Sequence, residues 1–180
     1  MSSSSLPMSS SGKDSAVDFS IRAARSGDSD VLFILDCFDS TLTFLAGIGS
    51  GEQWGARPFS KRPEMVQFIQ DCVISSNNDK TDQNAYIVEK RGEELVPCGA
   101  VIVDSSFPDY LIENNDAMKN LADLTNFLYL NVLVTHKGPS QLAKGAGDAL
   151  IDHVKAEARR RNNQTILVDC WNGNDGALIR

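Results

Sequence analysis

The feature that most constrains this fold is an apolar strand followed by a glycine-rich turn and an amphipathic helix. The run from Leu124 to Thr135 is apolar on both faces, which favours a central, fully buried strand. The turn Lys144–Gly147 then opens a helix predicted over residues 145–161, and a second apolar strand is predicted over Thr165–Trp171. A strand, a crossover helix and a second strand predict a βαβ unit with two parallel strands.

The helix of this unit is predicted to bury one stripe and to present an anion site at its start. The buried stripe has apolar residues four apart, at Ala146, Leu150, Val154 and Ala158. The first backbone N–H groups of a helix have no intrahelical partner, and the helix dipole favours negative charge there. Glycine also removes the Cβ that would keep a phosphate away from the backbone. The turn therefore predicts a site for a phosphate-bearing ligand.

The rest of the chain predicts one domain, over residues 19–180, after a disordered Ser-rich tail at residues 1–18. Its first half is predicted to contain a strand, two helices and a hairpin. These are a strand over Phe19–Ala23, a helix capped by Asp28 with apolar positions at Val31, Leu32, Leu35, Phe38, Leu42 and Leu45, a helix over Met65–Ile74 after Pro63, and a hairpin of Ala85–Lys90 with Val96–Asp104.

Composition excludes several classes of function. The net charge of −7 leaves no basic stripe for nucleic acid, and no apolar run is long enough to span a bilayer. The four cysteines form no CxxC pair, and the two histidines exclude a multi-histidine metal site. We therefore expect a cytoplasmic protein with reduced thiols and no metal.

Several segments of the chain resemble the GNAT superfamily of acyl-CoA-dependent N-acetyltransferases. The similar segments are Ile21–Ala24 with Asp28, Glu52–Gly55, Leu130–Thr135, Gly145–Gly147 and Leu167–Asn174. No single motif decides the resemblance, but their order along residues 19–180 matches the family. It implies an α/β (α+β) fold, with a splayed mixed sheet flanked by helices.

The resemblance also implies where acetyl-CoA binds as co-substrate. Its pantetheine arm would pair with backbone groups of Leu133, Val134 and Thr135, and the side chain of Asn174 would reach the same arm. Its diphosphate would lie on the N–H groups of the turn and helix start, which we expect at Lys144, Gly145, Ala146, Gly147 and Asp148. The segment with Glu52 and Trp54 resembles a loop that lines the acceptor pocket.

Three departures from the family pattern weigh on this interpretation. Leu142 stands where the family has Gln or Arg, although Gln141 is adjacent. Asp148 is a carboxylate beside the expected phosphate, which Lys144 would offset. The chain ends at Arg180, before the tyrosine and the last strands that family members carry. We expect a truncated protein; strands from a partner or a cofactor-binding remnant are the alternatives.

The sequence proposes candidates for the chemistry without naming a single base. Tyr129 and Asn131 are expected to share a face of the central strand, because side chains alternate. Asp169 is expected on the neighbouring strand as base or as attractor of a cationic amine, or simply as an exposed carboxylate. A backbone N–H near Val134 is the expected oxyanion donor.

The other reactive residues have plainer interpretations. Glu52 is expected to be a solvated charge, and Trp54 to anchor its loop or to pack on a cationic substrate. His136 is expected in an exposed loop, His153 on the helix surface, and Cys170 as a buried thiol.

Two functions follow from these expectations. The first is an acetyl-CoA-dependent N-acetyltransferase that acts by direct attack of a primary amine of a small molecule or peptide. The second is a non-catalytic acyl-CoA-binding or interaction protein of the same fold. A P-loop nucleotide site is excluded because the chain has no GxxxxGK[ST] segment. A homodimer is compatible with the apolar strand edge at Thr165–Trp171.

Overall fold

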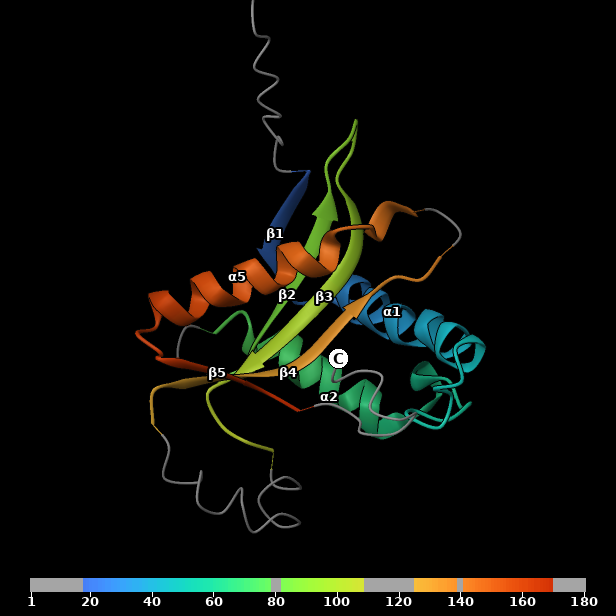
Figure 1. The fold of residues 1–180 in the computed structure, drawn as a ribbon, viewed down its shortest axis with the longest axis horizontal. Coiled ribbons are helices and arrows are strands. Elements are labelled where there is room, and N and C mark those ends of the chain that lie inside the picture. Colours follow the sequence, from blue (N-terminus) through green and yellow to red (C-terminus); the bar gives the residue numbers. More distant parts are fainter. Residues whose placement is uncertain (1–17, 79–81, 109–124, 139–140, 170–180) are drawn as a thin grey trace, which may run out of the picture.

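A computed structural model describes residues 18–78, 82–108, 125–138 and 141–169 of the chain. Its centre is a mixed sheet of five strands in the order β1-β2-β3-β4-β5 (Figure 1). The strands are β1 (Phe19–Ala23), β2 (Asn84–Lys90), β3 (Val96–Asp104), β4 (Phe127–Thr135) and β5 (Thr165–Val168). The first four pair antiparallel, and β4 pairs parallel with β5. The predicted hairpin and the predicted parallel pair are both confirmed.

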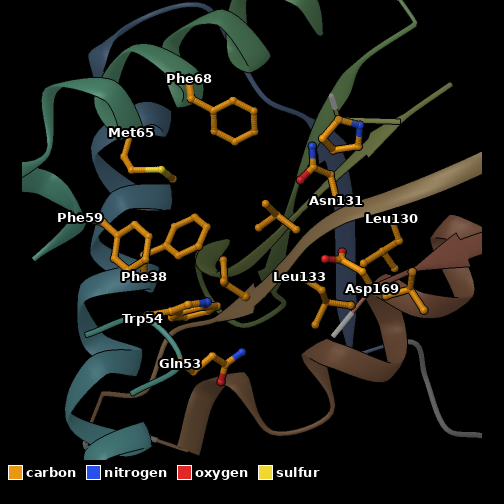
Figure 2. Close-up of a pocket in the computed structure, with 14 residues that line it drawn as sticks. Phe38, Gln53, Trp54, Phe59, Met65, Phe68, Leu130, Asn131, Leu133 and Asp169 are labelled. Carbon is orange, nitrogen blue, oxygen red and sulfur yellow. The ribbon is translucent and has the colours of Figure 1, made fainter. Parts of the chain in front are cut away.

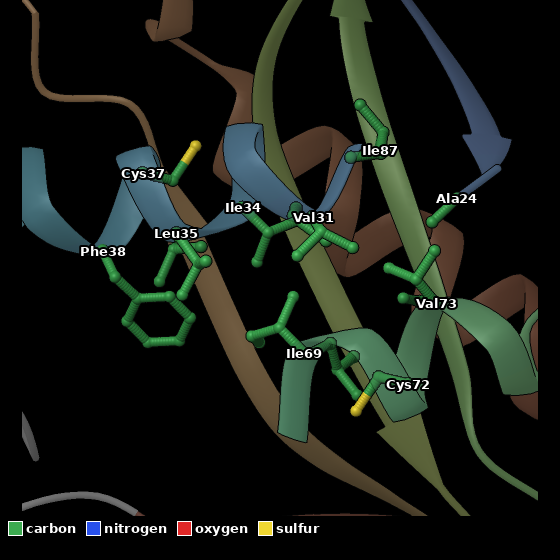
Figure 3. Close-up of a cluster of buried hydrophobic side chains, with 14 of the residues drawn as sticks. Ala24, Val31, Ile34, Leu35, Cys37, Phe38, Ile69, Cys72, Val73 and Ile87 are labelled. Atoms are coloured by element: carbon green, nitrogen blue, oxygen red, sulfur yellow. The ribbon is translucent and has the colours of Figure 1, made fainter. Parts of the chain in front are cut away.

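Helices cover both faces of this sheet (Figure 1). One face carries α1 (Asp28–Gly47), the short η1 (Phe59–Lys61) and α2 (Pro63–Ser75); the other carries α5 (Ala146–Arg160), which follows η2 (Gln141–Ala143). Figure 3 shows Val31 and Ile34 of α1 meeting Ile69 and Val73 of α2 against the sheet. The mixed α/β class expected from the sequence is thus the observed one.

The start of α1 differs from the prediction. Gly27, at φ 139°, is the N-cap, and Asp28 is the first helical residue rather than the cap. Most of the predicted stripe is buried, including Val31, Leu35, Phe38 and Leu45, but Leu32 is 62% exposed, and the buried Ile34 was not predicted. The apolar residues of this helix lie nearly all round it, so periodicity alone did not select the face.

The helix α5 is confirmed together with its stripe. Ala146, Leu150, Val154 and Ala158 are all buried, and they pack on Leu128 and Leu130 of β4 among others. His153 was expected on the helix surface, and this is wrong. Its ring packs edge-on against Tyr86 of β2 at 4.4 Å between centroids, and burial lowers the pKa of His153. In the described part of the chain, no helix is both long and apolar enough to cross a membrane.

Candidate functional site

The site lies where β4 and β5 separate. The two strands pair from Phe127 with Thr165 to Leu130 with Val168. Beyond this point β4 continues to Thr135, still paired with β3, while no described strand pairs with its other edge. Figure 1 shows the two strands in contact at one end and diverging from it. The splayed sheet implied by the resemblance is therefore present in the described residues.

A β-bulge at Asn131 marks the point of separation. Leu130 pairs with Val103 and Val132 with Ile102, so Asn131 is an extra residue in β4. The extra residue reverses the alternation of side chains. Leu128 and Leu130 face α5, but after the bulge Val132 and Val134 face α1 and α2 instead. The strict alternation assumed from the sequence therefore does not hold past Asn131.

The backbone of β4 after the bulge presents hydrogen-bonding groups to the open side. The amide of His136 donates to Cys98 O at 2.9 Å, so His136 and Cys98 form a hydrogen-bonded pair of the β3–β4 ladder. Such pairs alternate along an antiparallel ladder, which also directs the N–H and C=O of Val134 toward β3. The same alternation directs the N–H and C=O of Leu133 and Thr135 away from β3. The donor expected near Val134 is thus on its neighbours and not on Val134 itself.

A cleft of about 800 Å³ opens beside this edge (Figure 2). Its first wall consists mainly of aromatic and thioether side chains: Phe38 of α1, Trp54 of the 48–58 connection, Phe59 of η1, and Met65 and Phe68 of α2. Its second wall is β4 from Leu130 to Val134, with Val168 and Asp169 at the end of β5. The cleft is therefore an apolar slot between the aromatic wall and the open strand edge.

The three residues expected to carry chemistry lie near each other at this edge. Asn131 and Asp169 line the cleft, and Tyr129, which is only 1% exposed, donates its hydroxyl hydrogen to Asp169 Oδ1 at 2.5 Å. Because Tyr129 pairs with Leu167 in the parallel ladder, the side chains of Tyr129 and Asp169 lie beside each other, although these two residues are 40 positions apart in sequence. The arrangement supplies a carboxylate that already accepts one hydrogen bond from a phenol.

The two residues expected in the acceptor loop have different positions. Trp54 lines the cleft and packs on Phe38 and Phe59, with ring centroids 5.4 Å from each. Glu52 is exposed and is not among the described lining residues. Its expected description as a solvated charge fits, and it has no structural support as a substrate ligand.

The neighbouring Gln53 is a cleft residue that the sequence analysis missed. Its side chain lines the cleft, and its Oε1 is buried without a hydrogen-bond partner among the described residues. Its backbone N–H donates to Ser50 O at 3.1 Å, which holds the turn before Trp54. The only signal in the sequence was its adjacency to Trp54, since nothing in the local pattern shows which side chain of a loop points inward.

The N-terminus of α5 has the geometry expected for an anion site. Gly145 is the N-cap at φ 85°, in the left-handed region, and its carbonyl accepts from Ala149 at 3.1 Å. No described side chain caps this end of the helix. A Cβ added to Gly147 would meet no atom within 4 Å, so the backbone here is open to an approaching ligand. Lys144 and Asp148 are both exposed beside it, as the sequence suggested.

A second cavity of about 530 Å³ connects the end of β4 with this turn. It is lined by Ser40, Thr43 and Phe44 of α1, by Thr135 to Gly138, and by Ala143 and Lys144. The open edge of β4 and the start of α5 therefore lie on either side of the same cavity. Both belong to the stretch 133–148, in which residues 139–140 are not described.

His136 is more constrained than an exposed loop histidine. Its Nδ1 accepts from the Gly138 amide at 3.0 Å, which leaves Nε2 as the protonated nitrogen that faces Asp36 Oδ2 at 3.0 Å. The adjacent Lys137 amide donates to Ser40 Oγ at 3.0 Å. These contacts tie the segment after β4 to α1, so His136 has a positioning role in the fold. Asn174 and Cys170 lie outside the described residues.

The described residues offer no set of side chains that could bind a metal ion. Residues 18–78, 82–108, 125–138 and 141–169 contain no group of three His, Cys, Asp or Glu side chains placed to hold an ion. Cys37, Cys72 and Cys98 are buried free thiols, and burial raises the pKa of Cys72 to about 12. These thiols are therefore poor nucleophiles and poor ligands.

Comparison with solved structures identifies the fold. PaiA N-acetyltransferase from Thermoplasma acidophilum, solved in complex with coenzyme A, matches with a TM-score of 0.57 at 13% identity, over 89% of this chain and 84% of that one. A protein from Desulfovibrio desulfuricans, named as an acetyltransferase of the GNAT family, matches with a TM-score of 0.55 at 14% identity, over 90% and 79%. No protein-family model and no curated protein matches the sequence. The chain thus has the fold of the GNAT acetyltransferases, and the resemblance found in the sequence is confirmed at that level.

Proposed function

We propose that this protein is an acetyl-CoA-dependent N-acetyltransferase that transfers an acetyl group to a primary amine of a small molecule or peptide. The observation that carries the proposal is the open edge of β4 at Leu133 and Thr135, which ends beside the uncapped start of α5. An extended chain with amide groups can pair with such an edge, and an anionic group can bind at such a helix start. The coenzyme A in the PaiA neighbour supports the same ligand.

The residues present fit this ligand. The outward C=O of Leu133 and the outward N–H and C=O of Thr135 would hold the pantetheine amides, which leaves the Leu133 N–H for the thioester carbonyl. The amides of Ala146, Gly147 and Asp148 would hold the diphosphate, with Lys144 adding positive charge. The open space over Gly147 is what such a close approach needs. The exposed carboxylate of Asp148 opposes phosphate and would lower the affinity.

The cleft would then hold the acceptor amine next to the open edge. When bound, acetyl-CoA supplies an activated acyl group as a thioester. The neutral amine forms a C–N bond to the acyl carbon, the C–S bond breaks, and the proton lost by nitrogen balances the one gained by the thiolate. The Leu133 amide, which faces away from β3, would stabilise the negative charge that develops on the carbonyl oxygen.

The Tyr129–Asp169 pair would handle the proton of the amine. Asp169 lines the cleft and would attract the ammonium form and accept its proton directly or through a water held by Asn131. Tyr129 would keep the carboxylate oriented through its hydrogen bond. Tyr129 is thus a positioning residue in this proposal, and Asp169 is the one that meets the amine.

Two measurements test the proposal. Calorimetric titration of acetyl-CoA should show binding that Gly147→Glu weakens at least tenfold, because this substitution adds a negative charge where the diphosphate would lie. Release of free thiol should then depend on added amine. Binding without amine-dependent release would favour the non-catalytic acyl-CoA-binding protein instead, and an absence of binding by the folded chain would contradict both.

Cellular location and assembly remain part of the same proposal. A cytoplasmic enzyme would meet acetyl-CoA and keep its thiols reduced. A homodimer is compatible with the edge strand β5, and size-exclusion chromatography with light scattering would measure it directly.

A further inference from the structure

The aromatic wall of the cleft offers an apolar surface larger than an amine alone requires. Phe38, Trp54 and Phe59 contact one another, with ring centroids 4.7 to 5.4 Å apart. Phe38 and Phe59 belong to the core cluster between α1 and α2, so this wall is rigid. Such a wall favours a ring that can stack or meet it edge-on.

The charges around the cleft distinguish between kinds of ligand. Asp169 is the one ionisable side chain among the described lining residues, and it is acidic. Arg62, which follows η1, donates to Trp54 O at 2.7 Å and lies 4.1 Å over the Phe59 ring, so its guanidinium is already engaged. A cationic ligand therefore suits the cleft, and a ligand carboxylate would meet no described basic partner there.

Gln53 adds a specific polar feature between the two walls. Figure 2 shows its side chain in the cleft between Trp54 and Leu133. Its Oε1 is buried and has no hydrogen-bond partner in the described structure. A buried carbonyl oxygen without a donor is unfavourable, and a ligand N–H would satisfy it.

We propose that the acceptor is a primary amine that carries an aromatic ring and no carboxylate, and that Gln53 is the residue that binds its amino group. The ring lies against Phe38, Trp54 and Phe59, and an N–H of the amine donates to Gln53 Oε1. Asp169 complements the positive charge from the opposite side of the slot. This inference rests on the proposed acetyltransferase function.

The experiment compares three matched acceptors by thiol release: 2-phenylethylamine, butylamine and L-phenylalanine. The first two differ by the ring, and the first and third by the carboxylate. We expect the kcat/KM for 2-phenylethylamine to exceed that for butylamine at least tenfold and that for L-phenylalanine at least a hundredfold. Equal or reversed values would overturn the inference and leave the acetyltransferase function standing.

Variants test the residues. Gln53→Leu keeps the size of the side chain and removes the acceptor oxygen, and we expect it to raise the KM for 2-phenylethylamine about tenfold with little change in kcat. Trp54→Leu should bring the kcat/KM values for 2-phenylethylamine and butylamine within about threefold of each other. Gln67→Leu is the matched control, because Gln67 is an α2 residue that binds Asp71 outside the cleft. Unchanged kinetics in Gln53→Leu would overturn its assigned role.

Direct binding separates this inference from the proposed function. Calorimetric titration of each amine into the full chain requires no transfer, and thermal melting of each variant reports whether it is folded. Tighter binding of 2-phenylethylamine than of butylamine would support the inference even if no acetyl transfer were seen. Equal affinity would overturn it.

Discussion

The two halves of β4 have the same apolar character in the sequence and different surroundings in the structure. The closed half, Phe127–Leu130, pairs with β5 along its whole length and with β3 at Tyr129 and Leu130, and it is at most 7% exposed. The open half, Asn131–Thr135, pairs with β3 and keeps an edge that no described strand covers, and four of its five residues are half-buried. An apolar strand can therefore be completed by protein or left for a ligand, and its residue types do not say which.

The bulge at Asn131 separates the two halves. It interrupts the regular pairing of β4 with β3 and reverses the faces of the sheet toward which successive side chains point. After it, the amides of Leu133 and Thr135 are directed away from β3.

The largest effect should come from proline at neighbouring positions of the open half. Val134→Pro removes an amide directed at β3 and should cost more than about 3 kcal/mol of the free energy of unfolding. Leu133→Pro removes an outward amide, so the fold should lose less, while acetyl transfer should fall about a hundredfold. Urea unfolding and thiol release measure the two effects. Equal destabilisation by both would contradict the assigned amide directions.

Truncation of one leucine in each half of β4 should give a smaller difference in the free energy of unfolding. Leu128 is fully buried in the closed half, and Leu128→Ala should cost about 3 kcal/mol of the free energy of unfolding. Leu133 is half-buried in the open half, and Leu133→Ala should cost about 1 kcal/mol. Differential scanning calorimetry would compare them. The comparison fails if the two losses are the same.

Acid should weaken the ion pairs at the C-terminal end of α5, the helix that covers the closed half. Arg160 and Arg161 donate to the buried Glu157 at 2.6 and 2.7 Å and lower its pKa from 4.5 to about 2. A depressed carboxyl pKa stabilises the fold above pH 4.5, and this stabilisation is lost as the pH falls toward 2. With screening at the exposed Arg160, we expect a loss of about 2 kcal/mol.

The measurement is the free energy of unfolding of the protein from pH 6 down to about pH 3, with two variants. Glu157→Gln should flatten much of the pH dependence. Glu93→Gln, at an exposed hairpin position, should leave the curve unchanged. His153 contributes in the same direction below its ordinary pKa of 6.5, since its lowered pKa disfavours protonation in the fold. A pH profile that Glu157→Gln leaves intact would remove the ion pairs as its cause.

The smallest effect should separate the two glycines of the turn. Gly145 has φ 85°, and a Cβ there would lie 3.4 Å from Phe19 Cε2, so Gly145→Ala should destabilise by about 1 kcal/mol. Gly147 has open space and a helical position, so Gly147→Ala should leave stability equal or slightly higher. Only the affinity for acetyl-CoA should fall for Gly147→Ala. Thermal melting and calorimetry with each variant measure both properties.

Much of the fold could be predicted because the spacing of apolar residues and the residues of tight turns determine it locally. The stripe of α5 repeats every four residues, and the β2–β3 hairpin is bounded by a Gly-containing turn. Leu32 was wrongly assigned to the buried face of α1 and His153 to the surface of α5, because burial depends on a partner that lies far away in sequence. Tyr86, the ring that covers His153, is 67 positions before it.

The candidate site was only partly predictable for the same reason. The strand, the turn and the glycines were found, and Tyr129, Asn131 and Asp169 do lie at one edge. Gln53 was missed, and Glu52, which was named for the site, is exposed and is not among the described lining residues of the cleft. Loop side chains have no period, so only their packing shows which of three adjacent residues faces the cleft.

The sequence by itself determined the order of strands and helices, the crossover from β4 to β5 and the open turn before α5. Hydrophobic period, glycine and chain order are local properties, and they were sufficient for those features. Only the tertiary structure decided where the described pairing of β4 with β5 ends, which of its amides face the cleft, and which rings line the opposite wall. Pairing register and side-chain packing join residues distant in the chain, and no local pattern encodes them.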